Sequence, residues 1–384
     1  LSSYIPHDRS EILFLFPDAA TLSVLPWRPQ TGRVVRFFCS VRTADGSPYG
    51  ADGRHILRRT LRRLADAGYE CRVGAECEFY LFERDAEGRP TKRPQDNGGY
   101  FDVAPLDRGE NVRREICLTL EEMNIRPESS HHEQGPGQNE VDFKHAAPLT
   151  AADDVITFKN VVKTVAARNG LYGSFSPKPL ADKPGSGMHV NISLARGGRN
   201  IFAPGPDGAY SPAMRSFIAG VLARAGEICA FTNPVPGSYA RFGSFEAPRY
   251  VAWSHQNRSQ LIRIPAAPAP EYARIEVRMP DVSCNPYLAF ALLLAAGFEG
   301  MERKMELAEE TPYDLYTANA GALEALPASL EEAIARAGGS AFVEKVLSAD
   351  TARKYLALKQ AEQNRWFAAR DKEKYQDEAY FGVL

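Results

Sequence analysis

Several strand-like segments of this chain alternate charged or amide side chains with apolar ones. Successive side chains of a β-strand point to opposite faces, so residues two positions apart share a face. Glu76 therefore projects with Glu78, and His189 with Asn191, while the apolar residues between them face a core. Carboxylates so close together disfavour each other's charge unless a cation lies nearby. The pattern predicts sheet strands that line a cationic site, over residues 74–82, 187–194, 260–265 and 273–280.

Length and composition are those of an ordinary globular protein. The chain has 384 residues, enough for two domains or for one large domain with an appendage. Its net charge of −2 gives no reason to expect nucleic acid or an anionic membrane as partner. The longest apolar run, residues 287–298, is too short to span a bilayer and predicts a buried helix. No signal peptide is visible, and because the sequence starts at Leu1 we expect its true beginning to be missing.

The 6 cysteines lie far apart and include no C-x-x-C pair. This spacing argues against a thiolate zinc site and against a disulfide scaffold. It favours a reducing compartment, so we expect a cytoplasmic protein.

Blocks of strand and helix, without a strict β-α-β rhythm, indicate an α+β fold with an antiparallel sheet. Short β-rich runs at 12–16, 22–25 and 34–38 predict a small sheet domain that is incomplete at its start, and 44–50 reads as a linker. We therefore expect a small domain over 1–50 and a large one over 51–384. Helices are predicted at 52–67, 109–124, 151–169, 211–231, 285–308 and 350–373.

Two details of these helices are also predicted. Asp153 or Asp154 is a plausible N-cap of the third helix, and Gly170 a plausible stop. The first helix is rich in arginine, which could suggest nucleic acid, but no aromatic platform or second basic element accompanies it. We expect its arginines to form a solvated or intersubunit face. They are Arg58, Arg59, Arg62 and Arg63.

A Gly-Pro-Gly turn at 135–137 separates two acid-bearing arms and predicts a hairpin that brings Glu133 near Glu140. Oxygen ligands with a single nitrogen suit Mg²⁺ or Mn²⁺ rather than zinc or copper, and five carboxylates roughly match two divalent ions. A surface salt bridge would explain any one glutamate, but not a whole set on matching strand faces. His55, His145 and His255 are expected to be structural. The other candidate ligands are Glu76, Glu78, His189 and Glu276.

Arginines supply the complementary positive charge. Guanidinium groups hold carboxylate and phosphate oxygens in a bidentate fork. Two metal ions with several arginines are typical of phosphoryl transfer, although no P-loop of Walker type is present. The arginines concerned are Arg241, Arg258, Arg263, Arg274 and Arg278.

At these residues the chain resembles the glutamine synthetase family, of the bacterial class I type. The motifs occur in the family's order, and the likeness covers nearly the whole sequence. They are Glu76-Cys77-Glu78-Phe79, His131-His132-Glu133 through Gln138-Asn139-Glu140, Gly185-Ser186-Gly187-Met188-His189, Phe245-Glu246-Ala247-Pro248, Asn257-Arg258-Ser259 and Arg274-Ile275-Glu276-Val277-Arg278. The resemblance implies an N-terminal β-grasp domain, a catalytic domain whose antiparallel strands form a funnel, and a dodecamer of two stacked hexameric rings with shared active sites.

The resemblance also implies roles for individual residues. One metal site would comprise Glu78, Glu133 and Glu140, and a second Glu76, His189 and Glu276. Substrate glutamate would be held by Arg241, Arg278 and the Gly185 backbone. ATP would meet Arg258, Arg263 and Arg274 at its phosphates and Glu128, Asn191 and Ser193 in the nucleotide pocket. Catalytic roles would fall to Arg241, Arg258 and Glu246, a flap residue that accepts a proton from ammonium.

The implied reaction joins L-glutamate to ammonium. Transfer of phosphate from ATP makes γ-glutamyl phosphate, because a free carboxylate has only oxide as leaving group; ammonia then expels phosphate. The implied cofactors are ATP and two or more Mg²⁺ or Mn²⁺ ions, with no nucleic-acid or membrane partner.

Some positions depart from the family pattern. Leu1-Ser2-Ser3 stands near the family's Asp-Gly-Ser-Ser latch, Pro184 replaces an asparagine, and the segment 241–246 is one residue shorter. These departures leave open a γ-glutamyl ligase for a monoamine or polyamine, and a structural relative without catalysis is a further alternative. Tyr313, where some members carry an adenylylated tyrosine, is expected to be a plain surface residue.

Overall fold

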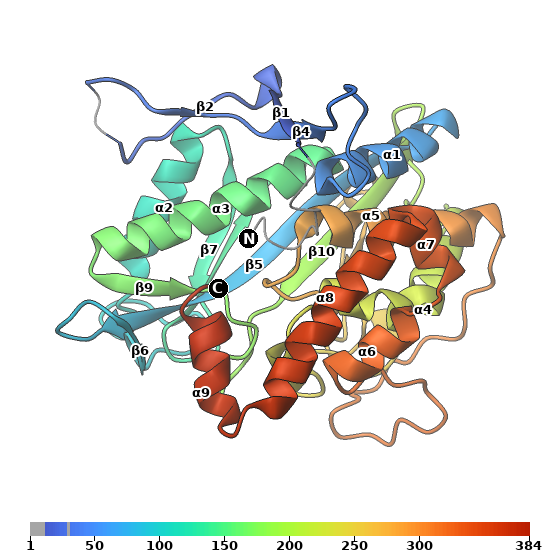
Figure 1. Cartoon of the computed structure of the whole chain (residues 1–384). Helices are drawn as coiled ribbons and strands as arrows, with labels where there is room; N and C mark the ends of the chain where they lie inside the picture. The colour runs from blue at the N-terminus through green and yellow to red at the C-terminus, as the bar shows by residue number, and fades with distance from the viewer. Residues whose placement is uncertain (1–11, 29–30) are drawn as a thin grey trace.

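The computed structural model describes residues 12–28 and 31–384 (Figure 1). Its largest feature is a 10-stranded sheet with the central order β12-β13-β14-β10-β5-β8-β7, from which β6, β9 and β11 branch. The described pairs in this sheet are antiparallel except β12 with β13. The strands are β5 (Glu70–Arg84), β6 (Pro90–Pro94), β7 (Pro127–His132), β8 (Gln138–Phe143), β9 (Leu171–Ser174), β10 (Met188–Arg196), β11 (Arg199–Asn200), β12 (Trp253–His255), β13 (Ile262–Ile264) and β14 (Ile275–Val277).

Helices cover the apolar face of this sheet (Figure 1). The predicted helices all form, and the mixed α+β class is confirmed. Their ends agree within three residues except that the fifth ends at Glu302 instead of 308 and the last at Ala368 instead of 373. Three short C-terminal helices, α6, α7 and α9, had no prediction. The helices are α1 (Gly53–Asp66), α2 (Glu110–Glu122), α3 (Pro148–Arg168), α4 (Pro212–Thr232), α5 (Pro286–Glu302), α6 (Leu330–Ala337), α7 (Ala341–Leu347), α8 (Ala349–Ala368) and α9 (Lys372–Gln376).

Helix α3 corrects the predicted cap. It begins at Pro148, whose fixed φ suits a first helical position, so neither Asp153 nor Asp154 is an N-cap. Asp153 is instead buried, 2.7 Å from Arg54 Nη2, and its other oxygen accepts a hydrogen bond from the Tyr287 hydroxyl. The helix ends at Arg168, and Gly170 follows with a φ of +73°, as the predicted stop requires.

The N-terminal part holds two small two-stranded sheets. β1 (Phe14–Pro17) pairs with β4 (Cys39–Arg42), and β2 (Ser23–Val24) pairs with β3 (Val35–Arg36). Residues 44–50 form a hydrogen-bonded turn, and the Tyr49 N–H donates to Val41 O at 2.9 Å. Backbone hydrogen bonds therefore hold this stretch against β4.

The arginines of α1 make bonds within the chain. Arg58 pairs with Asp18 at 2.8 Å, Arg59 donates to the Val346 carbonyl, and Arg63 lies 3.4 Å from Glu302. Helix α5 is apolar on all sides and buried along most of its length, as predicted for residues 287–298. Among the described residues, no helix is both long and apolar enough to cross a membrane, and the cysteines are free thiols.

Candidate active site

The strand registers place the predicted acidic residues opposite one another. Glu76 on β5 faces His189 on β10, and Glu78 faces Glu140 on β8. Asn191 in turn faces Glu276 on β14. Since side chains opposite each other on antiparallel strands lie only about 5 Å apart at Cβ, the four neighbouring strands β14, β10, β5 and β8 bring these groups to one surface.

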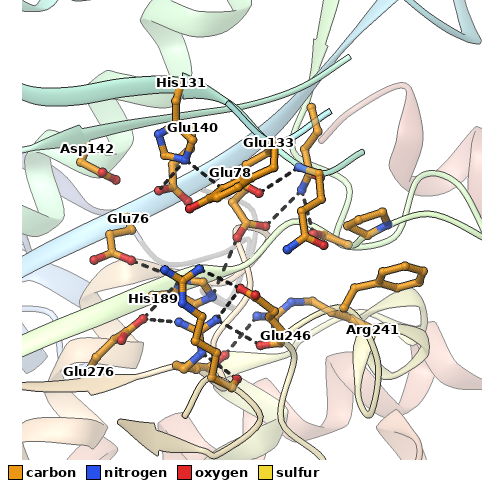
Figure 2. A pocket seen from close by; sticks show the side chains of 18 of the residues that line it. Glu76, Glu78, His131, Glu133, Glu140, Asp142, His189, Arg241, Glu246 and Glu276 are labelled. Carbon is orange, nitrogen blue, oxygen red and sulfur yellow. Dashed lines mark hydrogen bonds and ion pairs between the residues drawn. The ribbon is translucent and has the colours of Figure 1, made fainter. Parts of the chain in front are cut away.

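This surface is hollowed into a cavity of about 210 Å³ (Figure 2). Its lining contains every candidate metal ligand and most of the predicted substrate and phosphate residues. These are Glu76, Glu78, Glu133, Glu140, His189, Glu276, Gly185, Arg241, Glu246, Arg258, Arg263 and Arg278. The sequence-based set thus converges on one place although its members span about 200 positions of the chain.

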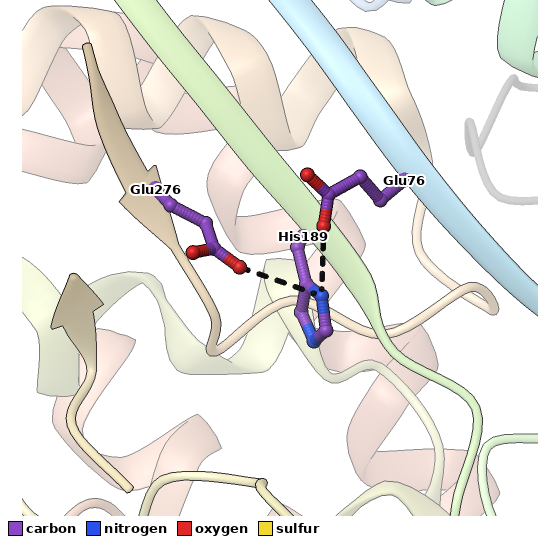
Figure 3. A group of neighbouring side chains, drawn as sticks. All are labelled: Glu76, His189 and Glu276. Carbon is purple, nitrogen blue, oxygen red and sulfur yellow. Dashed lines mark hydrogen bonds and ion pairs between the residues drawn. The ribbon is translucent and has the colours of Figure 1, made fainter. Parts of the chain in front are cut away.

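Glu76, His189 and Glu276 form one cluster in the lining of the cavity. Figure 3 shows both carboxylates directed at the same ring nitrogen: His189 Nδ1 lies 3.3 Å from Glu76 Oε2 and 3.6 Å from Glu276 Oε1. Glu276 is 1% exposed and also pairs with Arg278 and, at 2.7 Å, with Arg263. Glu276 therefore contacts both the candidate metal ligand His189 and the arginines.

The predicted hairpin forms from β7 and β8 and carries the second cluster. His131 Nε2 lies 2.9 Å from Glu133 and 3.8 Å from Glu140. Glu78, on the neighbouring strand, accepts the Gly187 N–H at 2.8 Å. Carboxylates of both hairpin arms and of β5 thus face the same cavity.

Burial and crowding disfavour ionised carboxylates in this cavity. The pKa of Glu78 is raised from its ordinary 4.5 to about 8, mainly by burial and then by Glu133. Burial, with Asp142 next, raises the pKa of Glu140 well above its ordinary range. Burial and Arg278 lower the pKa of His189, so its ring is neutral and able to act as a ligand. This donor set fits hard divalent cations, whose charge would restore the ionised carboxylates.

Arginines also line this cavity, beside the carboxylate clusters. Arg241 is buried and donates to the carbonyls of Met279 at 2.9 Å and Arg278 at 3.0 Å. Glu246 lies in a loop with a φ of +63° and pairs with Arg258 at 3.1 Å and Arg278 at 3.7 Å. These guanidinium groups can bind an anionic substrate beside the carboxylate clusters.

A second cavity of about 430 Å³ adjoins the first and shares Glu76 and Asp142 with it. It contains the remaining predicted nucleotide residues, Glu128, Asn191, Ser193 and Arg274. Asn191 connects the shared Glu76 to Arg274, because its amide donates to Glu76 at 2.7 Å while its oxygen accepts from Arg274 at 3.0 Å. The predicted phosphate arginines are thus divided, with Arg274 in the second cavity and the others in the first.

Several lining residues escaped the sequence reasoning. Asp142 lies in both cavities, and burial followed by Glu76 raises its pKa to about 6. Its position two residues after Glu140 was an available signal, since both lie on one strand face. His131 and Tyr100 also line the first cavity, and His145, expected to be structural, lines the second.

The structure places some of the positions that were compared with the family pattern. Pro184 lines the first cavity, and its carbonyl accepts the Tyr80 hydroxyl at 2.7 Å. Gly185 packs so closely that an added Cβ would lie 2.9 Å from Arg241 Cγ, which explains the need for glycine there. The latch position at Leu1-Ser2-Ser3 lies outside the described residues. Tyr313 is 47% exposed, in agreement with a surface position.

Comparison with known proteins supports the same interpretation. The model of the glutamine synthetase catalytic domain matches residues 50–377. Glutamine synthetase of Methanosarcina mazei is 44% identical over 358 residues, which cover 91% of this chain and 80% of the relative. That of Clostridium saccharobutylicum is 44% identical over 355 residues, again 91% and 80% of the two chains.

Solved structures agree in fold. One described as GmaS in complex with ADP gives a TM-score of 0.86 at 28% identity, over 98% of this chain and 87% of that one. Plasmodium falciparum glutamine synthetase gives 0.84 at 23% identity, over 98% and 87% of the chains, which is a likeness of fold. Because the family model and these relatives each cover most of the sequence, the chain belongs to the glutamine synthetase family.

Proposed function

We propose that the two adjoining cavities carry out ATP-dependent ligation of L-glutamate and ammonium to L-glutamine. The observation that carries this proposal is the convergence of the carboxylate clusters and the buried arginines on one cavity. Glutamine synthetases that are 44% identical over most of the chain support glutamate–ammonia ligase activity. The family's use of ATP and divalent metals agrees with the candidate acidic clusters.

The metal ligands divide into two sets in this proposal. Glu78, Glu133 and Glu140 would hold one Mg²⁺ or Mn²⁺ ion, and Glu76, His189 and Glu276 a second. Bound there, the ions would polarise phosphate oxygens and offset the charge of the transferring group. The raised pKa of Glu78 supports a cation beside it, because a nearby positive charge favours the carboxylate form.

Glutamate would bind in the first cavity and ATP in the second, on either side of Glu76 and Asp142, which line both. Arg241 and Arg278, with the Gly185 backbone, would hold glutamate, since Arg241 is buried and already fixed by two carbonyls. The nucleotide would occupy the second cavity against Glu128, Asn191 and Ser193. Arg258, Arg263 and Arg274 would face its phosphates. The GmaS structure described with ADP, 28% identical, supports a nucleotide site in this fold.

Phosphate transfer from ATP would convert the γ-carboxylate to γ-glutamyl phosphate, a better acyl donor. Arg241 and Arg258 would stabilise the charge that develops in this step. Glu246 would accept a proton from ammonium, and the resulting ammonia would attack the acyl carbon and release phosphate. The loop that carries Glu246 would exclude water, which otherwise hydrolyses the intermediate.

We also propose the finer assignments that the family likeness suggests. These are the bacterial class I type, a β-grasp arrangement of residues 1–50, a catalytic domain over 51–384 with a funnel-shaped sheet, and a homododecamer. The match of the family model from residue 50 supports that boundary. A cytoplasmic location agrees with free thiols.

One substitution tests the metal role directly. Glu78→Ala should abolish phosphate release from ATP in the presence of glutamate and ammonium. Glu83→Ala is a matched control, since Glu83 lies on the same strand and its side chain is 41% exposed. The assignment fails if Glu78→Ala turns over ATP at the rate of the control.

A further inference from the structure

A buried charged cluster lies against the Glu133–Glu140 hairpin and contributes nothing to the lining of either cavity described above. Its side chains are 0–6% exposed. We call this cluster the hairpin brace; its members are Asp96, Asp107, Arg113 and His132. Burial of so many charges is costly unless each is paired, so their contacts indicate what they hold in place.

His132 contacts the backbone of the neighbouring ligand residue. Its Nδ1 lies 2.7 Å from the carbonyl oxygen of Glu133, and its Nε2 lies 2.9 Å from Asp96 Oδ1. Both partners are acceptors, so both ring nitrogens must donate, and the ring is a cation paired with Asp96. The ring thereby fixes the peptide that carries the Glu133 side chain.

Asp96 connects this ring to the hairpin turn. Besides His132 it accepts the backbone N–H groups of Gly137 at 2.8 Å, Arg108 at 3.0 Å and Gly98 at 3.2 Å. Gly137 lies in the turn between Glu133 and Glu140. One carboxylate therefore bonds to both the end of the first arm and the turn of the hairpin.

The other half of the brace holds the second arm. Arg113 pairs with Asp107 at 2.6 and 3.1 Å, and its Nη1 donates to Asn139 Oδ1 at 2.7 Å. Asn139 directly precedes Glu140. The fit is close, because a Cβ added at Gly109 would lie 2.8 Å from the same Asn139 oxygen.

The brace is not itself suited to a metal ion. Ligand atoms of Asp96, Asp107 and His132 lie within 4.8 Å of one another, the spacing of a metal site. However, Arg113 occupies both oxygens of Asp107, and His132 Nε2 carries the proton that it donates to Asp96. Ion pairing therefore accounts for the cluster.

We propose that Asp96 and His132 are positioning residues that hold Glu133 in the place where it can bind a metal ion. The proposal rests on the proposed function, in which Glu133 is a metal ligand. Residues that orient metal ligands usually change metal affinity or activity by about 10- to 100-fold when they are replaced. His132 touches neither cavity, so its effect must pass through the hairpin.

The test measures Mn²⁺ binding by isothermal titration calorimetry and compares the full unsubstituted chain with the His132→Gln variant. We expect two binding events in the unsubstituted protein. His132→Gln should weaken one of them by about 10- to 100-fold and leave the event at the Glu76, His189 and Glu276 site unchanged. Asp96→Asn should weaken the same event, and if His132→Gln does not fold, Asp96→Asn alone decides.

Two more variants complete the design: a control far from the hairpin, and a substitution of the proposed metal ligand Glu133. Arg224→Gln removes a partly buried ion pair with Glu299, at 2.8 Å between α4 and α5, and should lower stability without changing either event. Unchanged affinities in both brace variants would overturn the proposal, and so would an equal loss at both sites. Glu133→Gln separates the two ideas: if it leaves both events intact, the proposed ligand set is wrong whatever the brace does.

Discussion

At the scale of single residues, the raised pKa of Glu78 links the cavity to the stability of the protein. Its pKa of about 8 is far above its ordinary 4.5 because the side chain is buried beside Glu133. Between these two pH values the folded, metal-free protein binds more protons at this residue than the unfolded chain does. The free energy of unfolding therefore falls as pH rises through this window.

This sign gives a prediction for the metal-free protein. Its free energy of unfolding, measured by urea denaturation, should decrease between pH 5 and pH 8, and Glu78→Gln should flatten that dependence. Glu83→Gln, at a side chain of the same strand that is 41% exposed, should leave the slope unchanged. Saturating Mn²⁺ should raise stability most at the high-pH end, because binding requires ionised carboxylates. An equally steep fall in the Glu78→Gln variant would contradict this account of the residue.

At the scale of elements, the packing of α4 on α5 depends on two glycines. A Cβ added at Gly220 would lie 2.8 Å from Gly300 Cα, and one at Gly300 would meet the Ser216 carbonyl. Gly300→Ala should therefore destabilise the protein by about 1–3 kcal/mol, as overpacking does in other cores. Urea denaturation measures the loss. Gly50→Ala is the matched control, since its added Cβ meets nothing within 4 Å, and an equal effect of both would refute the packing argument.

The elements that sequence reasoning predicted best are those with a clear period. The alternation of Glu76 with Glu78 follows from the strand itself, and the Gly135–Gly137 turn has few conformations open to it, so β5 and the hairpin were predictable. The predicted start of α3, at residue 151, was wrong because the apolar periodicity begins after Pro148, where the helix starts. Short helices such as α6 (Leu330–Ala337) depend on packing more than on a repeating pattern.

Single side chains that act through a neighbour were the hardest to predict. Asp142 carried one signal, its place on the strand face of Glu140, whereas no such spacing marked His131 or Tyr100 as lining the cavity. The brace of Asp96 with His132 joins residues 36 positions apart, a contact that only the folded chain reveals.

At the scale of the whole molecule, β1 presents apolar side chains outward. Phe14 is 47% exposed, Leu15 68% and Phe16 46%, which is unusual for adjacent apolar residues on a strand. The proposed dodecamer would bury such a surface. By light scattering coupled to gel filtration, the native assembly should have about twelve times the mass of the 42.3 kDa chain. Leu15→Asp should reduce that mass and Tyr313→Asp should not; a chain that is monomeric without substitution would contradict the proposed assembly.

The choice of acceptor tests the whole account most directly. Phosphate release should be measured with ATP, glutamate and Mg²⁺, with ammonium or a primary amine such as methylamine as the acceptor, and the product identified by mass spectrometry. The account predicts rapid phosphate release with ammonium and formation of glutamine in equal amount. Phosphate release with the amine but none with ammonium would contradict it.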